Sequence, residues 1–320
     1  MARARFLMGT RLSIETGGPA PERAFEEAFA EVSRLERILS NWIKTSEISR
    51  LNEEAGRAPV RCSRELFGAL SAALRWAETT GGAFDPTVEP LTRAFGLRDD
   101  GRAPGDASPG VASAPDTSLA TLPIGWRHVQ LMTAERTVRF DGPGMGIDLG
   151  GIGKGIALDA AARTLRRLGV RSALLDFGGQ VLAIGRPPKE RAWAVGIADP
   201  DERGRAVAVI DVTDVSVATS GNAERSVMGP DGPIGHILDP QTRRPASFGG
   251  SVTVAARDAT SADALSTALF VMGPERGVAW ADAREIAAVY LCRDEDGVMR
   301  RRPTRAFVER FGEGDDDDGD

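Results

Sequence analysis

Apolar residues recur at helical spacing in four segments of the chain. In the first of them the apolar positions fall three or four residues apart with charged residues between them, which predicts an amphipathic helix. The four predicted helices span about 21–39, 63–80, 155–168 and 262–272. Gly169 directly follows the third segment, at the position where glycine commonly ends a helix.

Shorter apolar runs bounded by turn residues predict strands between and after these helices. They lie at about 127–131, 137–140, 172–177, 181–184, 192–197, 207–212, 251–255, 287–292 and 297–301. The last two should form a closing hairpin, and the chain contains no internal repeat. Because helices and strands are mixed without strict alternation, the expected fold class is α+β, with a largely antiparallel sheet.

Two segments differ from the rest in composition. Residues from 98 onward are rich in Ala, Pro, Gly, Asp and Ser and hold almost no large apolar residue, so we expect a flexible surface insertion at about 98–120. The last ten residues hold six acidic side chains and no basic one, which predicts a disordered acidic tail at 311–320. The remainder, within residues 1–310, is expected to form a single domain.

Charge and hydropathy exclude several classes of function. The chain of 320 residues has 46 acidic and 40 basic side chains, and the tail accounts for the whole excess. A neutral body argues against a polyanion-binding surface, so no nucleic-acid partner is expected. No apolar run approaches the ~18 residues of a membrane-spanning helix. The first residues are too short an apolar run for a secretory signal, so we expect a cytoplasmic protein unless a leader was trimmed from the sequence.

A glycine-rich segment, GPGMGIDLGGIGKG, leads into the predicted helix at 155–168. Glycines let a backbone approach phosphates closely, and a helix N-terminus with Lys154 beside it favours anions, so the segment could cradle a diphosphate. It matches neither common nucleotide motif: Asp148 stands at the first glycine of a P-loop register and Gly155 follows the lysine. A tight turn with a solvated lysine explains the residues equally well.

Two further constellations carry oxygen ligands and a base. Asp263 and Thr267 lie four residues apart and would share one helix face, where a carboxylate and a hydroxyl suit Mg²⁺. Taken alone, simpler roles are favoured: Asp263 would stabilise the positive start of the helix, and Thr267 would hydrogen-bond back to its own helix. His236 lies three residues before Asp239, a spacing that can orient a histidine for proton transfer, although a histidine held in a turn is the simpler interpretation.

Two loop residues are candidates for ligand contact. Asp85 lies in a loop constrained by glycines and prolines, where it would bind a ligand or cap the turn. Pro86 and Pro90 predict an extended or turning path for this segment. Trp42 lies in an otherwise polar stretch, where it would stack on a planar ring or cover the core.

Taken together, eight segments resemble the ApbE family, the FAD:protein FMN transferases, and they occur in the family's order. They are MGT (8–10), LSNWIKTSEISRLN (39–52), GGAFDPTVEPL (81–91), IDLGGIGKGIALD (147–159), DFGGQVLAIG (176–185), ATSGNAER (218–225), HILDPQT (236–242) and ADALSTALFVMG (262–273). The similarity extends from about Leu7 to Arg310. It implies an ApbE-like (T-fold-like) architecture with a flavin site between sub-lobes.

The resemblance also implies an activity. Members transfer FMN from FAD to a threonine or serine hydroxyl of a partner flavoprotein and release AMP, with Mg²⁺ or Mn²⁺ as the metal. Two alternatives stay open on the sequence: a non-catalytic FAD-binding protein, and a Mg²⁺-dependent FAD pyrophosphatase in which water replaces the acceptor hydroxyl.

Roles carried over from the family fall on three groups of residues. The metal ligands would be Asp263, Thr267 and the main-chain carbonyl of Gly151. His236 would act as the base, with Lys154 assisting at the phosphates and Asp239 as an alternative base. The FAD site would be lined by Met8, Trp42, Ala83, Phe84, Asp85, Asp148, Lys154 and Ile237.

Three positions depart from the family pattern. Trp42 stands where tyrosine is frequent, and a larger ring still stacks. Ala223 replaces an aromatic residue that commonly follows the TSG element, which predicts a more open wall. Arg243 stands where glycine is usual; because arginine tolerates a positive φ poorly, this residue questions the turn after Asp239.

Overall fold

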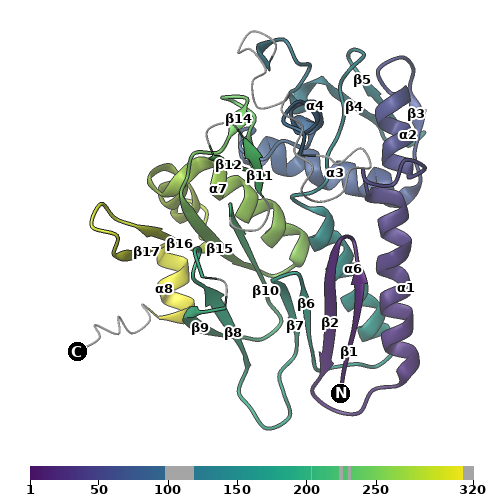
Figure 1. Ribbon diagram of the computed structural model, residues 1–320. Coiled ribbons are helices and arrows are strands. Elements are labelled where there is room, and N and C mark those ends of the chain that lie inside the picture. Colours follow the sequence, from purple (N-terminus) through teal and green to yellow (C-terminus); the bar gives the residue numbers. More distant parts are fainter. Residues whose placement is uncertain (98–118, 203, 223–225, 230–231, 313–320) are drawn as a thin grey trace.

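A computed structural model describes residues 1–97, 119–202, 204–222, 226–229 and 232–312. An antiparallel sheet of eight strands runs through this part of the chain in the order β1-β2-β6-β7-β10-β15-β16-β17 (Figure 1). These strands are β1 (Ala2–Leu7), β2 (Thr10–Thr16), β6 (Ala173–Phe177), β7 (Gln180–Ile184), β10 (Ser216–Gly221), β15 (Gly250–Ala256), β16 (Ala287–Arg293) and β17 (Met299–Pro303). The expected α+β class is confirmed.

Three long helices cover one face of the sheet: α1 (Glu22–Leu39), α6 (Gly153–Arg167) and α7 (Ala259–Asp282). α1 packs on α6, α6 on α7, and α7 on strands β10 and β15. Their apolar stripes meet inward-facing sheet residues such as Leu12, Leu175 and Val254 in one continuous core. Burying a side chain of this size contributes about 1.5–3 kcal/mol, so this core fixes where α6 and α7 cross.

The opposite face of the sheet is covered by the hairpin of β8 (Trp193–Ala198) and β9 (Ala206–Val212) and by α8 (Arg305–Phe311). Alternate residues of β8 point inward, which follows from the two-residue period of a strand. Because the central strands are covered on both faces, β7 and most of β15 and β16 are continuously apolar or buried.

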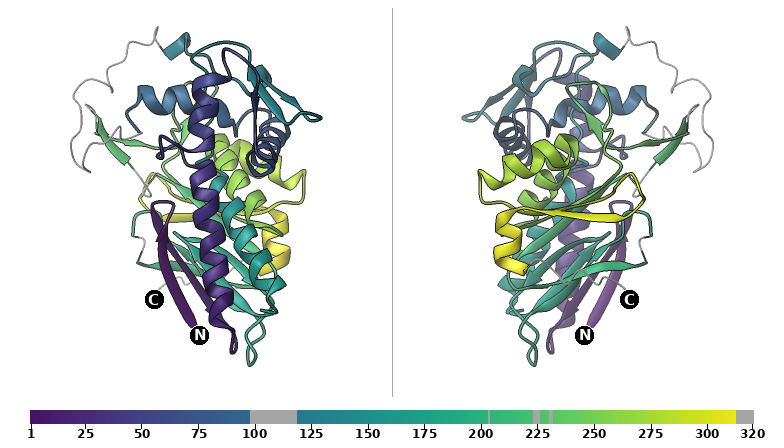
Figure 2. Two further views of the ribbon diagram at one scale, coloured as in Figure 1. Left: turned by 90° about the vertical axis from the view of Figure 1, so that its right-hand side faces the viewer. Right: turned by 90° about the vertical axis from the view of Figure 1, so that its left-hand side faces the viewer.

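A smaller lobe lies above the sheet and the helix layer in Figures 1 and 2. It consists of α2 (Glu47–Glu54), α3 (Arg64–Thr79), η1 (Pro86–Val88), α4 (Glu89–Ala94), η2 (Trp126–His128) and a sheet of β3 (Val60–Arg61), β5 (Thr137–Phe140) and β4 (Val129–Met132). Two short antiparallel ribbons complete the described elements: β11 (Ser226–Gly229) with β12 (Gly232–Gly235), and β13 (Leu238–Asp239) with β14 (Arg244–Pro245).

The periodicity predicted α1, α3, α6 and most strands to within about two residues and only the middle part of α7, and it missed other elements for local reasons. The polar stretch after residue 40 contains α2, whose N-terminus is capped by the Ser46 hydroxyl accepting from Ser49 N at 3.1 Å. The segment at Pro86 and Pro90 was expected to be extended or turning, which is wrong. It forms η1 and then α4, because proline is tolerated in the first turn of a helix.

Helix α7 passes its expected end at residue 272. Gly273 has φ 69° and introduces a kink, after which Pro274 begins a further helical segment. Strands β1, β2 and β10 and helix α8 were not predicted. In the residues that the structure describes, no helix is long and apolar enough to cross a membrane.

The two segments of unusual composition lie mostly outside the described residues, as does Ala223. At their edges, Leu119 is buried and packs against Leu91, while Phe311 ends α8 with its ring 5.0 Å from that of Phe307. Both residues therefore belong to the folded part, although the expected boundaries included them in the insertion and the tail. The single-domain organisation stays a prediction.

Candidate active site

Helices α6 and α7 cross with their backbones in close contact. A β-carbon at Gly155 would lie 2.2 Å from the carbonyl oxygen of Ala259, so only glycine fits at this crossing. Gly155 N donates to Asp263 Oδ2 at 2.9 Å, and Lys154 Nζ lies 3.7 Å from Asp263 Oδ1. Asp263 is buried, and this burial raises its pKa, while the Lys154 ammonium acts in the opposite direction.

The loop before α6 brings a second predicted group to the same place. A β-carbon at Gly151 would lie 2.9 Å from Thr267 Oγ1 and 3.3 Å from the ring of Phe84. Thr267 lies one helical turn after Asp263, on the same face of α7. The structure therefore brings Gly151, Asp263 and Thr267 together, next to Lys154.

Asp148 and the residue before it are fixed by long-range hydrogen bonds. Asp148 Oδ1 accepts from Gly150 N at 2.8 Å, and Asp148 N donates to Pro86 O at 2.7 Å. The side-chain amides of Asn41 and Asn52 both donate to Ile147 O at 2.9 Å. The loop is thus tied to the segment on either side of Trp42. The sequence analysis did not identify either asparagine as a site residue. The only indication was that both amides lie in one polar segment of the sequence.

Asp85 is buried and engaged on both of its oxygens. Oδ1 accepts from Thr87 N at 2.8 Å and from Thr87 Oγ1 at 2.6 Å, while Oδ2 accepts from Trp126 N at 3.0 Å. Burial raises the pKa of Asp85, and these donors oppose that shift. Ala83 and Phe84, directly before it, are also buried.

Met8 and Trp42 were predicted to line the FAD site. Met8 has φ 48° in the tight turn between β1 and β2, and its N–H donates to Glu36 Oε1 at 2.8 Å. The Met8 methyl group lies 3.8 Å from where a β-carbon of Gly153 would be. Trp42 is 54% exposed, which leaves much of its ring accessible for stacking.

His236 and Ile237 lead directly into the β13–β14 ribbon. Ile237 O accepts from Ala246 N at 2.8 Å, which extends the pairing of the ribbon by one step. Ile237 is buried in the same core as Phe84, whereas His236 is half-buried. Asp239 Oδ1 accepts from Gln241 N at 2.8 Å, so one oxygen of this carboxylate shapes the turn.

Other residues hold the start of α7 and were not predicted. Asp159 of α6 accepts from Ala259 N at 2.9 Å and from Thr260 N at 3.0 Å, so it binds the first free N–H groups of α7. Gln180 Nε2 donates to Ala259 O at 2.8 Å. Asp159 lies 100 residues before Ala259 in the sequence, and Gln180 lies 79 residues before it, so no local sequence pattern predicts these contacts.

Asp263 is also held through its own backbone. Ser220 Oγ donates to Ser266 Oγ at 2.9 Å, and Ser266 Oγ donates to Asp263 O at 3.0 Å. Both serines are buried, so this chain joins β10 to α7 inside the core.

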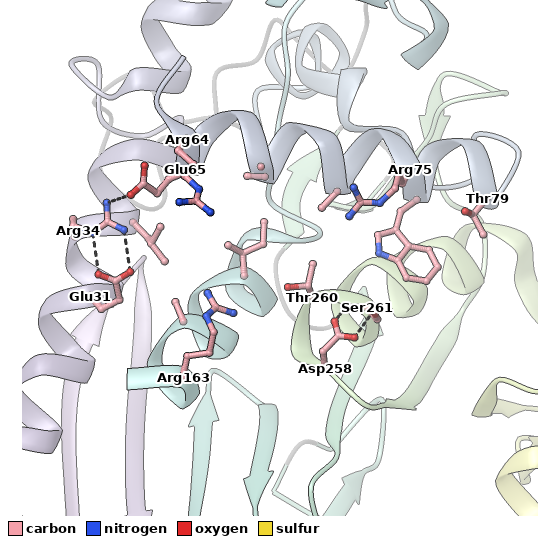
Figure 3. A pocket seen from close by; sticks show the side chains of 17 residues that line it. Glu31, Arg34, Arg64, Glu65, Arg75, Thr79, Arg163, Asp258, Thr260 and Ser261 are labelled. Carbon is pink, nitrogen blue, oxygen red and sulfur yellow. Dashed lines mark hydrogen bonds and ion pairs between the residues drawn. The ribbon is translucent and has the colours of Figure 1, made fainter. Parts of the chain in front are cut away.

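A cavity of about 790 Å³ lies between α1, α3, α6 and the first turn of α7 (Figure 3). None of the residues predicted for the site lines it. Arg34 forms ion pairs with Glu31 and Glu65 at its edge, and Asp258 accepts from Ser261 N as the cap of α7. These charged side chains are therefore engaged with protein groups, whereas Gly151, Lys154, Asp263 and Thr267 lie elsewhere, around the start of α6.

The family model described as ApbE family matches residues 8–290. The chain belongs to the ApbE family. It is 35% identical over 298 residues to a Treponema pallidum protein named FAD:protein FMN transferase, covering 87% of this chain and 80% of that protein. It is 32% identical over 301 residues to a Vibrio cholerae protein of the same name, covering 91% of this chain and 86% of the relative.

Solved structures of ApbE proteins resemble the whole chain. The apo flavinyl transferase ApbE from Pseudomonas stutzeri superposes with a TM-score of 0.83 at 29% identity, covering 98% of both chains. The ApbE protein from Thermotoga maritima superposes with a TM-score of 0.84 at 29% identity, covering 97% of this chain and 99% of that one. The expected family, fold and transferase class are confirmed.

Proposed function

We propose that this protein catalyses the Mg²⁺-dependent transfer of FMN from FAD to a threonine or serine hydroxyl of a partner flavoprotein, with release of AMP. The observation that carries the proposal is the convergence of Gly151, Asp263 and Thr267 at the start of α6, beside the Lys154 ammonium.

The donor set fits a hard divalent cation. Asp263 offers a carboxylate, Thr267 a hydroxyl and Gly151 a carbonyl, and Mg²⁺ and Mn²⁺ prefer such oxygen ligands. In the described residues there is no group of three His, Cys, Asp or Glu side chains that could hold a metal, so this mixed set is the best candidate. A small protein ligand set suits Mg²⁺, which keeps positions for water and phosphate oxygens.

The surrounding residues fit a dinucleotide. Trp42 presents an accessible ring for stacking, Phe84 and Ile237 supply buried apolar surface, and Lys154 supplies a positive charge next to the glycine loop. The carboxylates of Asp85 and Asp148 can accept hydrogen bonds from sugar hydroxyls or ring amines.

The reaction requires a base and a place for developing charge. The acceptor hydroxyl oxygen attacks the phosphorus of the FMN half, and its proton passes to His236. The bond from that phosphorus to the bridging oxygen breaks, and AMP leaves with that oxygen. Asp263, Thr267 and the Gly151 carbonyl would hold Mg²⁺, which would supply positive charge to offset the negative charge that develops in this step, and the Lys154 ammonium would add to it.

A single assay tests the proposal against its alternatives. The protein is mixed with FAD, Mg²⁺ and a candidate acceptor flavoprotein that lacks its covalent flavin. The proposal predicts both covalent flavin fluorescence on the acceptor and an equal amount of AMP. AMP without labelled acceptor would indicate the pyrophosphatase, and neither product with retained FAD binding would indicate a flavin-binding protein. Either of those results would contradict the proposal.

A further inference from the structure

Arg243 adopts a backbone conformation that favours glycine. Its φ is 59°, in the left-handed region, where an L-residue with a side chain is strained. The turn itself is closed by a main-chain bond, because Arg243 N donates to Asp239 O at 2.8 Å. Glycine would form the same turn without strain, so any benefit of arginine here comes from its side chain.

That side chain reaches across to another segment. Arg243 Nη1 donates to Leu119 O at 2.8 Å and to Leu122 O at 2.7 Å. Hydrogen bonds from a charged donor are stronger than those between neutral groups. Beside them, Leu119 and Leu238 are buried together with Leu91 in a small apolar cluster. The turn and the segment that begins at Leu119 are therefore joined by two kinds of contact.

The far end of this segment holds the loop of Asp85. Gly125 N donates to Thr87 Oγ1 at 2.7 Å, and Trp126 N donates to Asp85 Oδ2 at 3.0 Å. One stretch of chain, residues 119–126, is thus bound to Arg243 at one end and to Asp85 at the other.

The near end is the ribbon that follows His236. Asp239 pairs with Arg244 and Leu238 with Pro245, and Ile237 O accepts from Ala246 N. Arg243 lies in the turn of this ribbon, four residues after Asp239. Its guanidinium therefore connects the ribbon that presents His236 to the segment that orients Asp85.

We propose that Arg243 is a positioning residue, which fixes the position of the His236 ribbon relative to the Asp85 loop so that His236 meets the acceptor hydroxyl as it attacks the phosphorus. The inference rests on the proposed function, since it assigns His236 and Asp85 to the two sides of one FAD molecule. Without the guanidinium, the apolar cluster still joins the two segments, but the distance between them is less firmly set. The transfer step should then suffer more than FAD binding.

The test compares Arg243→Gly with Arg243→Lys in the full-length protein. Glycine keeps the turn and removes the side chain. Lysine keeps the positive charge. Because Leu119 O and Leu122 O both accept from the single nitrogen Nη1 of Arg243, one lysine ammonium has enough N–H donors for both carbonyls. The matched control is Arg136→Gly. Arg136 has φ 51° and is exposed, and in the described part of the chain only its backbone forms hydrogen bonds, accepting from Cys62 N and donating to Thr133 O.

We expect Arg243→Gly to lower kcat for FMN transfer roughly 10- to 100-fold, because displacing a catalytic group by about 1 Å can cost on the order of 10²-fold. The Kd for FAD, measured by quenching of flavin fluorescence, should change less than about twofold, since no FAD-lining residue is altered. Arg243→Lys should restore most of kcat, and Arg136→Gly should match the wild type.

Several results would overturn the inference. If the wild-type protein transfers FMN and Arg243→Gly does so at the same kcat, Arg243 positions nothing. If FAD affinity falls in parallel with kcat, or if lysine restores nothing, the residue acts as general support and the positioning role is wrong. If the wild-type protein itself transfers no FMN, the proposed function fails, and this inference fails with it.

Discussion

Two groups of the proposed site residues are held in place by different means. In the first group, α6 and α7 are in backbone contact at Gly155, with the buried Asp263 bonded across the crossing. In the second group, the His236 ribbon is joined to the segment that begins at Leu119 by the Arg243 guanidinium and by a small apolar cluster. The first arrangement holds the proposed metal ligands in a packed core, whereas in the second the proposed base depends on one guanidinium and a small apolar cluster.

This difference indicates which of the proposed site residues must be held rigidly. Electrostatic stabilisation is effective only when the groups are already in place, and a packed helix crossing provides that. A ribbon at the edge of the core can present a base and still leave room for an acceptor protein to approach. Substitutions should therefore cause larger losses at the helix crossing than at the ribbon.

Removing the carboxylate of Asp263 should have the largest effect. We expect Asp263→Ala to lower FMN transfer by on the order of 10²–10³ or more, because a main electrostatic group of the site is lost. Asp263→Asn is the matched control for shape, since its amide oxygen can still accept from Gly155 N. A similar loss in both variants, with cooperative unfolding retained, would assign the effect to charge. Full activity of either variant at low Mg²⁺ would contradict the metal site.

The hydroxyl of Thr267 should matter next. Thr267→Val keeps the shape of the side chain and removes the ligand oxygen, so the Mg²⁺ concentration at half-maximal rate should rise about tenfold or more. Thr267→Ser retains the hydroxyl and should stay close to the wild type. The measurement is the initial rate of FMN transfer as a function of Mg²⁺ concentration. The same half-maximal Mg²⁺ concentration for Thr267→Val and Thr267→Ser would exclude Thr267 as a ligand.

The close approach of the two helices predicts a loss of stability. Gly155→Ala places a β-carbon 2.2 Å from Ala259 O, and such overpacking typically costs about 1–3 kcal/mol of unfolding free energy. Gly68→Ala in α3 is the control, because nothing lies within 4 Å of its β-carbon position. That variant should be stabilised by about 0.5–1 kcal/mol. Urea unfolding measures both, and equal stabilities of the two variants would argue against a tight crossing.

The smallest expected effect concerns Asp85 and pH. Because burial raises the pKa of Asp85, the folded state binds this proton more tightly than the unfolded state. The resulting stabilisation is complete below the unfolded-state pKa of about 3.9 and is lost as the pH rises through the folded-state value. Asp85→Asn should remove this contribution.

Unfolding free energies measured across this pH range would show the effect as a wild-type advantage over Asp85→Asn that shrinks with rising pH. Asp141→Asn provides a control of opposite sign, since the hydrogen bond with His128 lowers the pKa of Asp141. The wild-type advantage over that variant should shrink as the pH falls. The same trend for both substitutions would contradict the burial argument.

Much of the helix crossing could be predicted from the sequence. Asp263 and Thr267 lie four residues apart on one helix, and glycines with a lysine precede another, so local spacing made both segments candidates for the site without deciding between a ligand role and a structural one. The family resemblance supplied what spacing could not, namely that the two segments meet. The supporting bond from Asp159 to Thr260 joins residues 101 positions apart, and no periodicity indicates it.

The ribbon side was much less predictable. Arg243 could be identified as unusual for its turn, because arginine tolerates a positive φ poorly, and the turn nevertheless forms. What makes it tolerable is a pair of carbonyls more than a hundred residues earlier in the chain. Helix α4 was missed for a different reason. Pro86 and Pro90 predicted an extended or turning path, but each stands in the first turn of a helical element.

The most direct measurement is anomalous diffraction from crystals of this protein soaked with Mn²⁺ and FAD. The account predicts one manganese peak within coordination distance of the Asp263 carboxylate, the Thr267 hydroxyl and the Gly151 carbonyl, in contact with the bridging phosphates of FAD. A manganese ion bound elsewhere, or FAD bound with its phosphates away from these three groups, would contradict it.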